Sequence, residues 1–134
     1  MRKSRKTKSQ QLINKCDKVW ADTIKERAEW RCEKCGRGKF KDAVILNAAH
    51  IVRRANKEVR WELGNGLSLC VRDHYWFDNS TNRLEVIEWL EEKLGKGFLS
   101  SLLERSRISL QWLVRDLENK LAELESFSMV KLYI

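Results

Sequence analysis

Proline is absent from this chain of 134 residues, and its six glycines are confined to three pairs, at positions 36 and 38, 64 and 66, and 95 and 97. Each glycine pair marks a turn, so the boundaries between structural elements can be placed along the sequence.

The chain also lacks the long apolar run of a membrane-spanning helix, which predicts a soluble protein with no membrane partner. No apolar stretch follows the basic amino end, so a secretory signal is not predicted and we expect a cytoplasmic protein.

Acidic residues are outnumbered, since 27 lysines and arginines against 19 aspartates and glutamates give a formal charge of +8. Residues 1–41 hold 14 basic and 5 acidic residues, whereas the rest of the chain is nearly neutral. A basic, flexible arm over residues 1–11 is typical of a polyanion binder, because lysine and arginine release condensed counterions from phosphates. The alternative is a solvated tail that only aids solubility. The candidate phosphate contacts in this arm are Arg2, Lys3, Arg5, Lys6 and Lys8.

The length and the 43% hydrophobic content fit one folded domain with a modest core. Apolar residues at spacings of three and four predict a helix over residues 12–31. Segments rich in β-branched residues predict two short strands, which gives an α+β fold. The predicted strands cover residues 43–52 and 66–71, and the later helices cover 72–79, 84–94 and 98–105.

The carboxyl-terminal segment carries a leucine stripe with a spacing close to 3.5 residues, formed by Leu110, Leu113, Leu117, Leu121 and Leu124. Such a stripe is typical of a coiled coil, which would form a homodimer, and also of a helix that folds back onto its own domain. Only about two heptads are present, so we favour folding back. The chain therefore divides into an arm (1–11), an amino-terminal helix (12–31), a central core (32–80) and a helical extension (81–134).

Four cysteines in a reducing compartment indicate metal binding or burial rather than disulfides. Cys32 and Cys35 form a CxxC knuckle, and the glycine that follows lets the backbone turn tightly around a metal ion. Cys70 comes 35 residues later, and Asp73 stands where a second CxxC would close. Three thiolates and one carboxylate complete a tetrahedral zinc site. Cys16 is the alternative fourth ligand, but it lies on the apolar stripe of the first helix, which favours burial.

Both histidines of the chain lie in the central core, His50 between Cys35 and Cys70 and His74 directly after Asp73. His50 ends an apolar strand and precedes a basic segment, which combines a group that titrates near neutrality with charges suited to phosphate, as phosphodiester hydrolysis requires. His74 and Asp78 are four residues apart, so on a helix they face the same way and can bind one divalent ion. The basic residues after His50 are Arg53, Arg54, Lys57 and Arg60.

Three motifs follow the knuckle in a fixed order, namely Ala48-Ala49-His50-Ile51-Val52, Asn65-Gly66-Leu67-Ser68-Leu69-Cys70 and His74-Tyr75-Trp76-Phe77-Asp78. Together they resemble the HNH endonuclease family, and the likeness covers about residues 30–80. The family fold implied is a ββα-metal finger, in which two antiparallel strands and a helix hold one catalytic ion. The helices after residue 80 are weakly similar to the tail of phage recombination proteins of the NinG type, which implies a bacterial or phage-infected host cell.

The resemblance also implies roles for individual residues. His50 would be the general base that takes a proton from the attacking water, and Asn65 would fix the connecting loop. His74 and Asp78 would bind magnesium or manganese, while zinc would only build the scaffold. The chain departs from the family twice: Ala49 stands where many members have a metal ligand, and Asp73 stands where a cysteine is usual.

We therefore expect a zinc-stabilised endonuclease that cuts or nicks DNA. By the family resemblance, the products would carry 5′ phosphate and 3′ hydroxyl ends. The basic arm and the basic segment after His50 would contact phosphates without reading sequence. One alternative is a catalytically weak, zinc-stabilised nucleic-acid-binding module. Another is a phage recombination accessory protein whose carboxyl-terminal helices recruit a partner.

Overall fold

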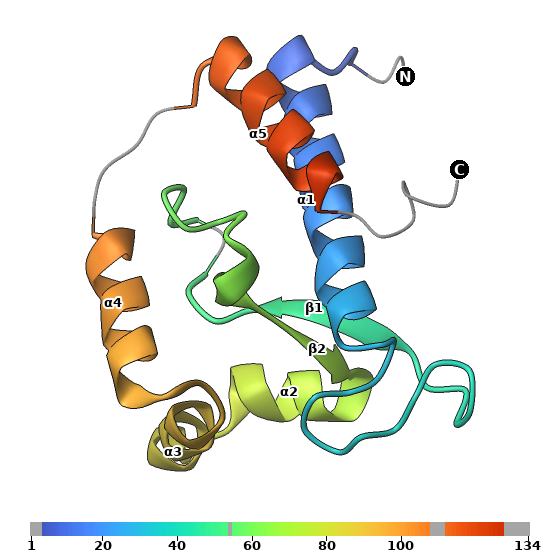
Figure 1. The fold of residues 1–134 in the computed structure, drawn as a ribbon, viewed down its shortest axis with the longest axis vertical. Coiled ribbons are helices and arrows are strands. Elements are labelled where there is room, and N and C mark those ends of the chain that lie inside the picture. The colour runs from blue at the N-terminus through green and yellow to red at the C-terminus, as the bar shows by residue number, and fades with distance from the viewer. Residues whose placement is uncertain (1–3, 54, 108–111, 128–134) are drawn as a thin grey trace.

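The computed structural model describes residues 4–53, 55–107 and 112–127. The described part is a mixed α+β fold, as the sequence predicts, with a two-stranded antiparallel sheet between helices (Figure 1). None of its helices combines the length and the apolar character needed to cross a membrane. In chain order the elements are α1 (Lys8–Arg27), β1 (Leu46–His50), the short 3-10 helix η1 (Leu63–Asn65), β2 (Gly66–Cys70), α2 (Val71–Asn79), α3 (Arg83–Leu94), α4 (Lys96–Ser106) and α5 (Val114–Ser126).

Helix α1 begins and ends earlier than the apolar spacing predicts. The side chain of Thr7 caps it by accepting a hydrogen bond from the backbone N–H of Gln10, so residues 8–11 belong to the helix and not to the basic arm. The predicted end at residue 31 is wrong as well. The helix ends at Arg27, and Glu29 and Trp30 adopt left-handed backbone conformations, with φ of 55° and 57°.

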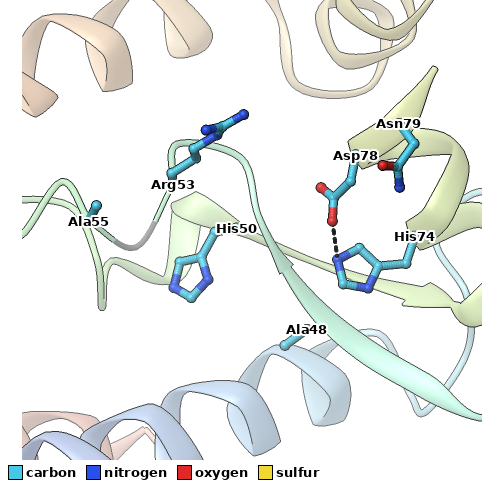
Figure 2. Close-up of a pocket in the computed structure, with 7 residues that line it drawn as sticks. All are labelled: Ala48, His50, Arg53, Ala55, His74, Asp78 and Asn79. Carbon is cyan, nitrogen blue, oxygen red and sulfur yellow. Dashed lines mark ion pairs between the residues drawn. The ribbon is translucent and has the colours of Figure 1, made fainter. Parts of the chain in front are cut away.

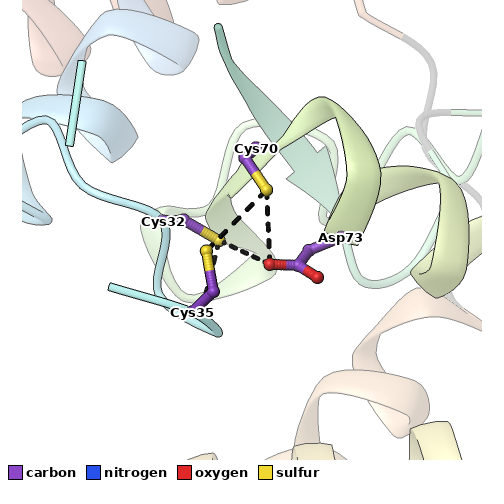
Figure 3. A group of neighbouring side chains, drawn as sticks. All are labelled: Cys32, Cys35, Cys70 and Asp73. Atoms are coloured by element: carbon purple, nitrogen blue, oxygen red, sulfur yellow. Dashed lines mark hydrogen bonds between the residues drawn. The ribbon is translucent and has the colours of Figure 1, made fainter. Parts of the chain in front are cut away.

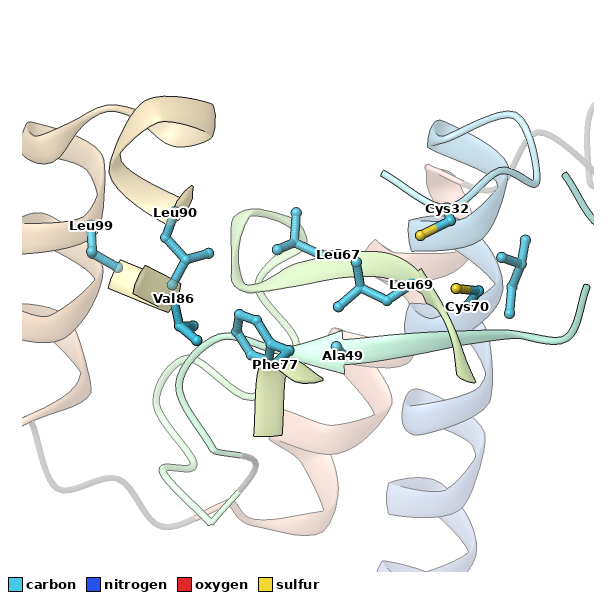
Figure 4. Close-up of a cluster of buried hydrophobic side chains, with 10 residues drawn as sticks. Cys32, Ala49, Leu67, Leu69, Cys70, Phe77, Val86, Leu90 and Leu99 are labelled. Atoms are coloured by element: carbon cyan, nitrogen blue, oxygen red, sulfur yellow. The ribbon is translucent and has the colours of Figure 1, made fainter. Parts of the chain in front are cut away.

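The sheet pairs β1 with β2 in a register that runs from Leu46 opposite Cys70 to His50 opposite Gly66. Helix α1 covers one face and α2 the other (Figure 1). The predicted strand over 43–52 is too long, because Ala43 has a positive φ of 54° and β1 ends at His50. Figure 4 shows the core on the α2 side, in which buried side chains of both strands meet Phe77, Val86, Leu90 and Leu99.

Helix α5 lies along α1 (Figure 1), so the leucine stripe folds back onto the domain. Leu117 and Leu124 are buried against Leu12, Cys16 and Trp20. The face expected for a homodimer is therefore covered within the chain, and dimerisation through this helix stays a prediction. Residue 110 of the stripe lies outside the described residues.

Candidate functional site

Four potential metal ligands gather where the loop after α1 meets the junction of β2 and α2 (Figure 3). They are the residues that the sequence predicts, Cys32, Cys35, Cys70 and Asp73, and their ligand atoms all lie within 4.8 Å of one another. Asp73 Oδ2 accepts from the thiols of Cys32 at 3.1 Å and Cys70 at 3.3 Å, and the sulfurs of Cys35 and Cys70 are 3.9 Å apart. The cluster could hold a metal ion.

Three of the six ligand-to-ligand distances in this cluster are close to those of a tetrahedral site. An ion bound at about 2.3 Å to sulfur and about 2.0 Å to oxygen, with tetrahedral angles, has edges of about 3.8 Å between sulfurs and about 3.5 Å between sulfur and oxygen. The observed sulfur–sulfur distance of 3.9 Å and the sulfur–oxygen distances of 3.1 and 3.3 Å lie close to these values. The side chains therefore need only small movements to take up an ion.

Backbone contacts fix the knuckle against the sheet. Gly36 adopts a φ of 77°, a conformation suited to glycine, and so allows the turn after Cys35. Glu33 joins the knuckle to β2 twice, since its N–H donates to the carbonyl of Ser68 at 2.7 Å and its carboxylate accepts from the N–H of Ser68 at 2.7 Å. The amino-terminal pair of ligands is thereby held beside the pair at the start of α2.

Protonation in this cluster follows from burial and hydrogen bonding. Burial raises the pKa of Cys32 to about 12. Burial also opposes ionisation of Asp73, but hydrogen bonds from Cys32, Cys35 and Cys70 outweigh it and lower the pKa of the carboxyl. At Cys35 burial is likewise outweighed, because hydrogen bonds from Arg37 lower the pKa of the thiol. Cys32 therefore keeps its proton at neutral pH, and a bound metal ion must displace it.

Cys16 is not part of this cluster. It is fully buried on α1, with its sulfur 3.8 Å from the carbonyl oxygen of Leu117 in α5, and burial raises the pKa of its thiol to about 11. The alternative that gave Cys16 the place of Asp73 is therefore wrong. Its position on the apolar stripe already indicated a buried residue.

A second site is a groove of about 560 Å³ between the end of β1 and α2 (Figure 2). His50, His74 and Asp78 all line it, so the structure brings the proposed base and the proposed ion ligands to one place. His74 Nε2 lies 3.0 Å from Asp78 Oδ2. Two atoms about 2.1 Å from an octahedral ion and at right angles to each other are also about 3.0 Å apart. The pair could thus occupy adjacent positions around one ion.

His50 is held in a defined orientation. Its ring stacks on Trp20 of α1, with centroids 4.0 Å apart and an angle of 12° between the planes. Its Nε2 lies 2.9 Å from the carbonyl oxygen of Arg60. Because a carbonyl only accepts, Nε2 carries the hydrogen, and Nδ1 is the acceptor nitrogen of the neutral ring. A group that takes a proton needs such an acceptor.

Asn65 fixes the loop that joins the two strands. It is fully buried, and its Oδ1 accepts from the backbone N–H of Val52 at 2.7 Å. Its Nδ2 donates to the carbonyls of Val52 and Val59, both at 3.0 Å. Three backbone groups of the loop are satisfied by this one side chain, and the loop delivers the carbonyl of Arg60 to His50.

Among the predicted phosphate contacts that the structure describes, Arg53 is exposed and lies at the groove, and Lys57, Arg5 and Lys6 are exposed elsewhere. Lys8 forms an ion pair with Glu118 at 3.3 Å. Positions 2, 3 and 54 lie outside the described residues.

Arg60 is a correction to the sequence analysis. Its guanidinium is 17% exposed and binds the carboxylate of Asp17 through two nitrogens, at 3.0 and 2.7 Å. Trp61 donates to the same carboxylate at 2.9 Å. An arginine engaged in this way joins the loop to α1 and is not available as a phosphate contact.

Sequence reasoning missed two residues that support the groove. Trp20 is assigned to the core by helical spacing, and nothing in the sequence indicates that His50 stacks on it. Asp17 is one of several charged residues on the same helix, and its partner Arg60 is 43 positions away. Comparison with protein-family models, curated proteins and solved structures found no match to the chain.

Proposed function

We propose that the chain is a metal-dependent endonuclease of the HNH type that hydrolyses phosphodiester bonds of DNA. The observation that carries the proposal is the groove that His50, His74 and Asp78 all line, in which His74 and Asp78 contact each other (Figure 2). The order of elements agrees with a ββα-metal finger, since the two antiparallel strands are followed at once by α2. Arg53 at the same groove supplies a positive charge for a phosphate.

Each groove residue has a task in this reaction. His50 takes a proton from the attacking water at Nδ1, because the carbonyl of Arg60 keeps the hydrogen on Nε2. His74 and Asp78 would hold magnesium or manganese, which when bound supplies a positive charge that stabilises the developing charge on the phosphate. Asn65 holds the loop and so keeps His50 aligned.

We further propose that the ion of the cysteine cluster is zinc and that its role is structural. Three of the four ligands are cysteines, the donor type that zinc prefers in closed tetrahedral sites. Cys32, Cys70 and Asp73 are buried, which leaves little space for a substrate at the ion. The cluster also joins the loop after α1 to the start of α2, the helix that carries His74 and Asp78.

A second candidate function is nucleic-acid binding without efficient cleavage. One observation favours it: Ala49 is buried in the core, so β1 supplies no ligand at the position before His50. An ion in the groove would rest on two protein ligands and on water. The two functions differ in one assay, because a binding module retards DNA and leaves it intact.

Relaxation of a supercoiled plasmid tests the proposal. Zinc-loaded protein is freed of other divalent ions, and Mg²⁺ or Mn²⁺ is then added. We expect the native chain to nick or cut the plasmid only with the added ion, and His50→Gln to lose cleavage while it keeps zinc, thermal stability and DNA binding. Glutamine keeps an N–H donor for the carbonyl of Arg60 but cannot act as a base. Cleavage by His50→Gln at the native rate would remove His50 from the mechanism, and retardation of intact DNA by the native chain would favour the binding module.

A further inference from the structure

A second basic surface lies at the opposite end of β1 from His50. Two adjacent hollows of about 190 and 360 Å³ share Val44 and Ile45 in their walls. Within the described part of the chain, four of the residues that line them are basic and none is acidic. We name this surface the knuckle face and define it as Trp30, Arg37, Lys39, Phe40, Ile45 and Arg72.

The knuckle face exposes apolar and aromatic groups between its cations. Phe40 is 79% exposed and Ile45 is 71% exposed. The Lys39 ammonium lies 4.7 Å from the ring centroid of Trp30 and 5.5 Å from that of Phe40, and the two rings are in edge contact at 6.4 Å. Exposed rings beside cations are the arrangement with which proteins bind single strands, since bases stack on the rings and phosphates contact the charges.

One carboxylate pairs with a cation of the knuckle face, since Arg72 Nε lies 3.6 Å from Asp73 Oδ1, so the charge offered to a ligand rests on Arg37 and Lys39. Asp42 accepts a hydrogen bond from the N–H of Gly38 at 2.8 Å and so serves the loop itself. Asp22 interacts with Lys18 at 2.9 Å and with Lys25, one of the four basic lining residues, at 3.9 Å. The carboxylates of an acidic peptide would pair with the cations. Such a peptide has no flat base to stack on the exposed Phe40 and Ile45.

The knuckle face and the groove are connected along one strand. Leu46 lines a hollow of the knuckle face, and Ala48 and His50 line the groove, so alternate residues of β1 run from one to the other. Four residues of strand extend about 13 Å. A few nucleotides of one nucleic-acid strand span that distance, so nucleic acid that is cut at His50 can reach the hollow that Leu46 lines.

We propose that the knuckle face binds unpaired nucleotides next to the phosphodiester that the groove cleaves, an inference that rests in part on the proposed function. In a duplex the bases are stacked on one another and do not present their faces to a side chain. The inference therefore narrows the substrate class to nucleic acid with a single-stranded portion, such as a branch, a gap or an overhang.

Fluorescence anisotropy with a labelled oligo(dT) tests the inference on zinc-loaded protein without Mg²⁺ or Mn²⁺, so that cleavage plays no part. The double variant Phe40→Ala/Lys39→Gln removes one exposed ring and one charge from the face. We expect its affinity for oligo(dT) to fall about tenfold or more. The matched control Phe127→Ala/Lys96→Gln removes the same two residue types from exposed positions at the end of α5 and the start of α4, and it should bind as the native chain does.

Other probes separate the competing explanations. A blunt hairpin duplex should bind more weakly than oligo(dT) and should lose little affinity in the double variant, and oligo(rU) in place of oligo(dT) shows whether the nucleotides are DNA or RNA. Native affinity of the double variant for both strands would overturn the inference. An equal loss of affinity for the hairpin in the double variant would also overturn it. So would binding of a poly-glutamate peptide that depends on Phe40, if oligo(dT) and oligo(rU) do not compete with each other for the protein.

The inference and the proposed function fail separately. If the native chain binds oligo(dT) through Phe40 but never cuts a plasmid, the knuckle face stands and the nuclease assignment falls. If the native chain cuts and the double variant cuts and binds like it, the nuclease assignment stands and the knuckle face falls.

Discussion

Replacement of Asn65 by alanine should cost more stability than any other single polar substitution in the loop. The change removes three hydrogen bonds and leaves the N–H and the carbonyl of Val52 without their partner, while the carbonyl of Val59 keeps the hydrogen bond from the N–H of Glu62 at 3.2 Å. Asn65 is fully buried, so water cannot simply replace the amide. Each unsatisfied buried group costs about 1–3 kcal/mol, so the two groups of Val52 lower the free energy of unfolding by about 2–5 kcal/mol once partial relaxation is included.

Urea unfolding at a fixed excess of zinc measures this cost, because a constant ligand concentration keeps the binding contribution equal in all variants. Asn65→Asp is the matched control: it keeps the acceptor for Val52 and loses both donations from Nδ2. It should therefore also destabilise the chain, since it places a carboxylate against two carbonyls. A loss of less than about 1 kcal/mol for Asn65→Ala would show that the amide does not hold the loop.

Three further predictions concern the cluster, the sheet and Arg60. Zinc affinity should rise about tenfold per pH unit between pH 6 and 8 for each proton that zinc displaces, because Cys32, with a pKa of about 12, is protonated without metal. Competition with a chelator measures this affinity, and an affinity that does not change with pH would contradict the prediction. Gly66→Ala should lower the free energy of unfolding in urea by about 1–3 kcal/mol, since a Cβ at this position would lie 2.5 Å from the Trp20 ring. It should also shift the NMR signals of the His50 ring, which stacks on Trp20. Unchanged stability and spectra would refute this packing. Arg60→Ala should lower stability by about 2 kcal/mol through loss of the Asp17 contacts, whereas a phosphate contact would change DNA affinity alone.

The elements and the cysteine cluster were predictable because their signals are local. The spacing of Cys32 and Cys35 and the helical offset of Asp73 from Cys70 bring the ligands close once the sheet forms, and the prediction that the four lie together is confirmed. The ends of α1 were not predictable from apolar spacing. They depend on the cap at Thr7 and on left-handed residues after Arg27, which leave no mark on the hydrophobic pattern.

The support of the groove depends on contacts between distant segments, which is why sequence reasoning missed it. His50 stacks on Trp20, which is 30 positions earlier in the chain. The carbonyl of Arg60 in the loop accepts a hydrogen bond from its Nε2. Arg60 was predicted to contact phosphate because it follows His50 in a basic segment. Its actual partner, Asp17, is on α1, and only the packing of that helix against the loop brings the two together.

Ligase treatment of nicked plasmid tests the central claim most directly. The claim is that His50 and an ion at His74 and Asp78 hydrolyse a phosphodiester, and the products implied by the HNH resemblance carry 5′ phosphate and 3′ hydroxyl ends. We predict that DNA ligase reseals the nicks made by the native chain with Mg²⁺ or Mn²⁺, and that His50→Gln produces no nicks to seal. Plasmid left intact by the native chain with either ion, or nicked equally by His50→Gln, would contradict the account.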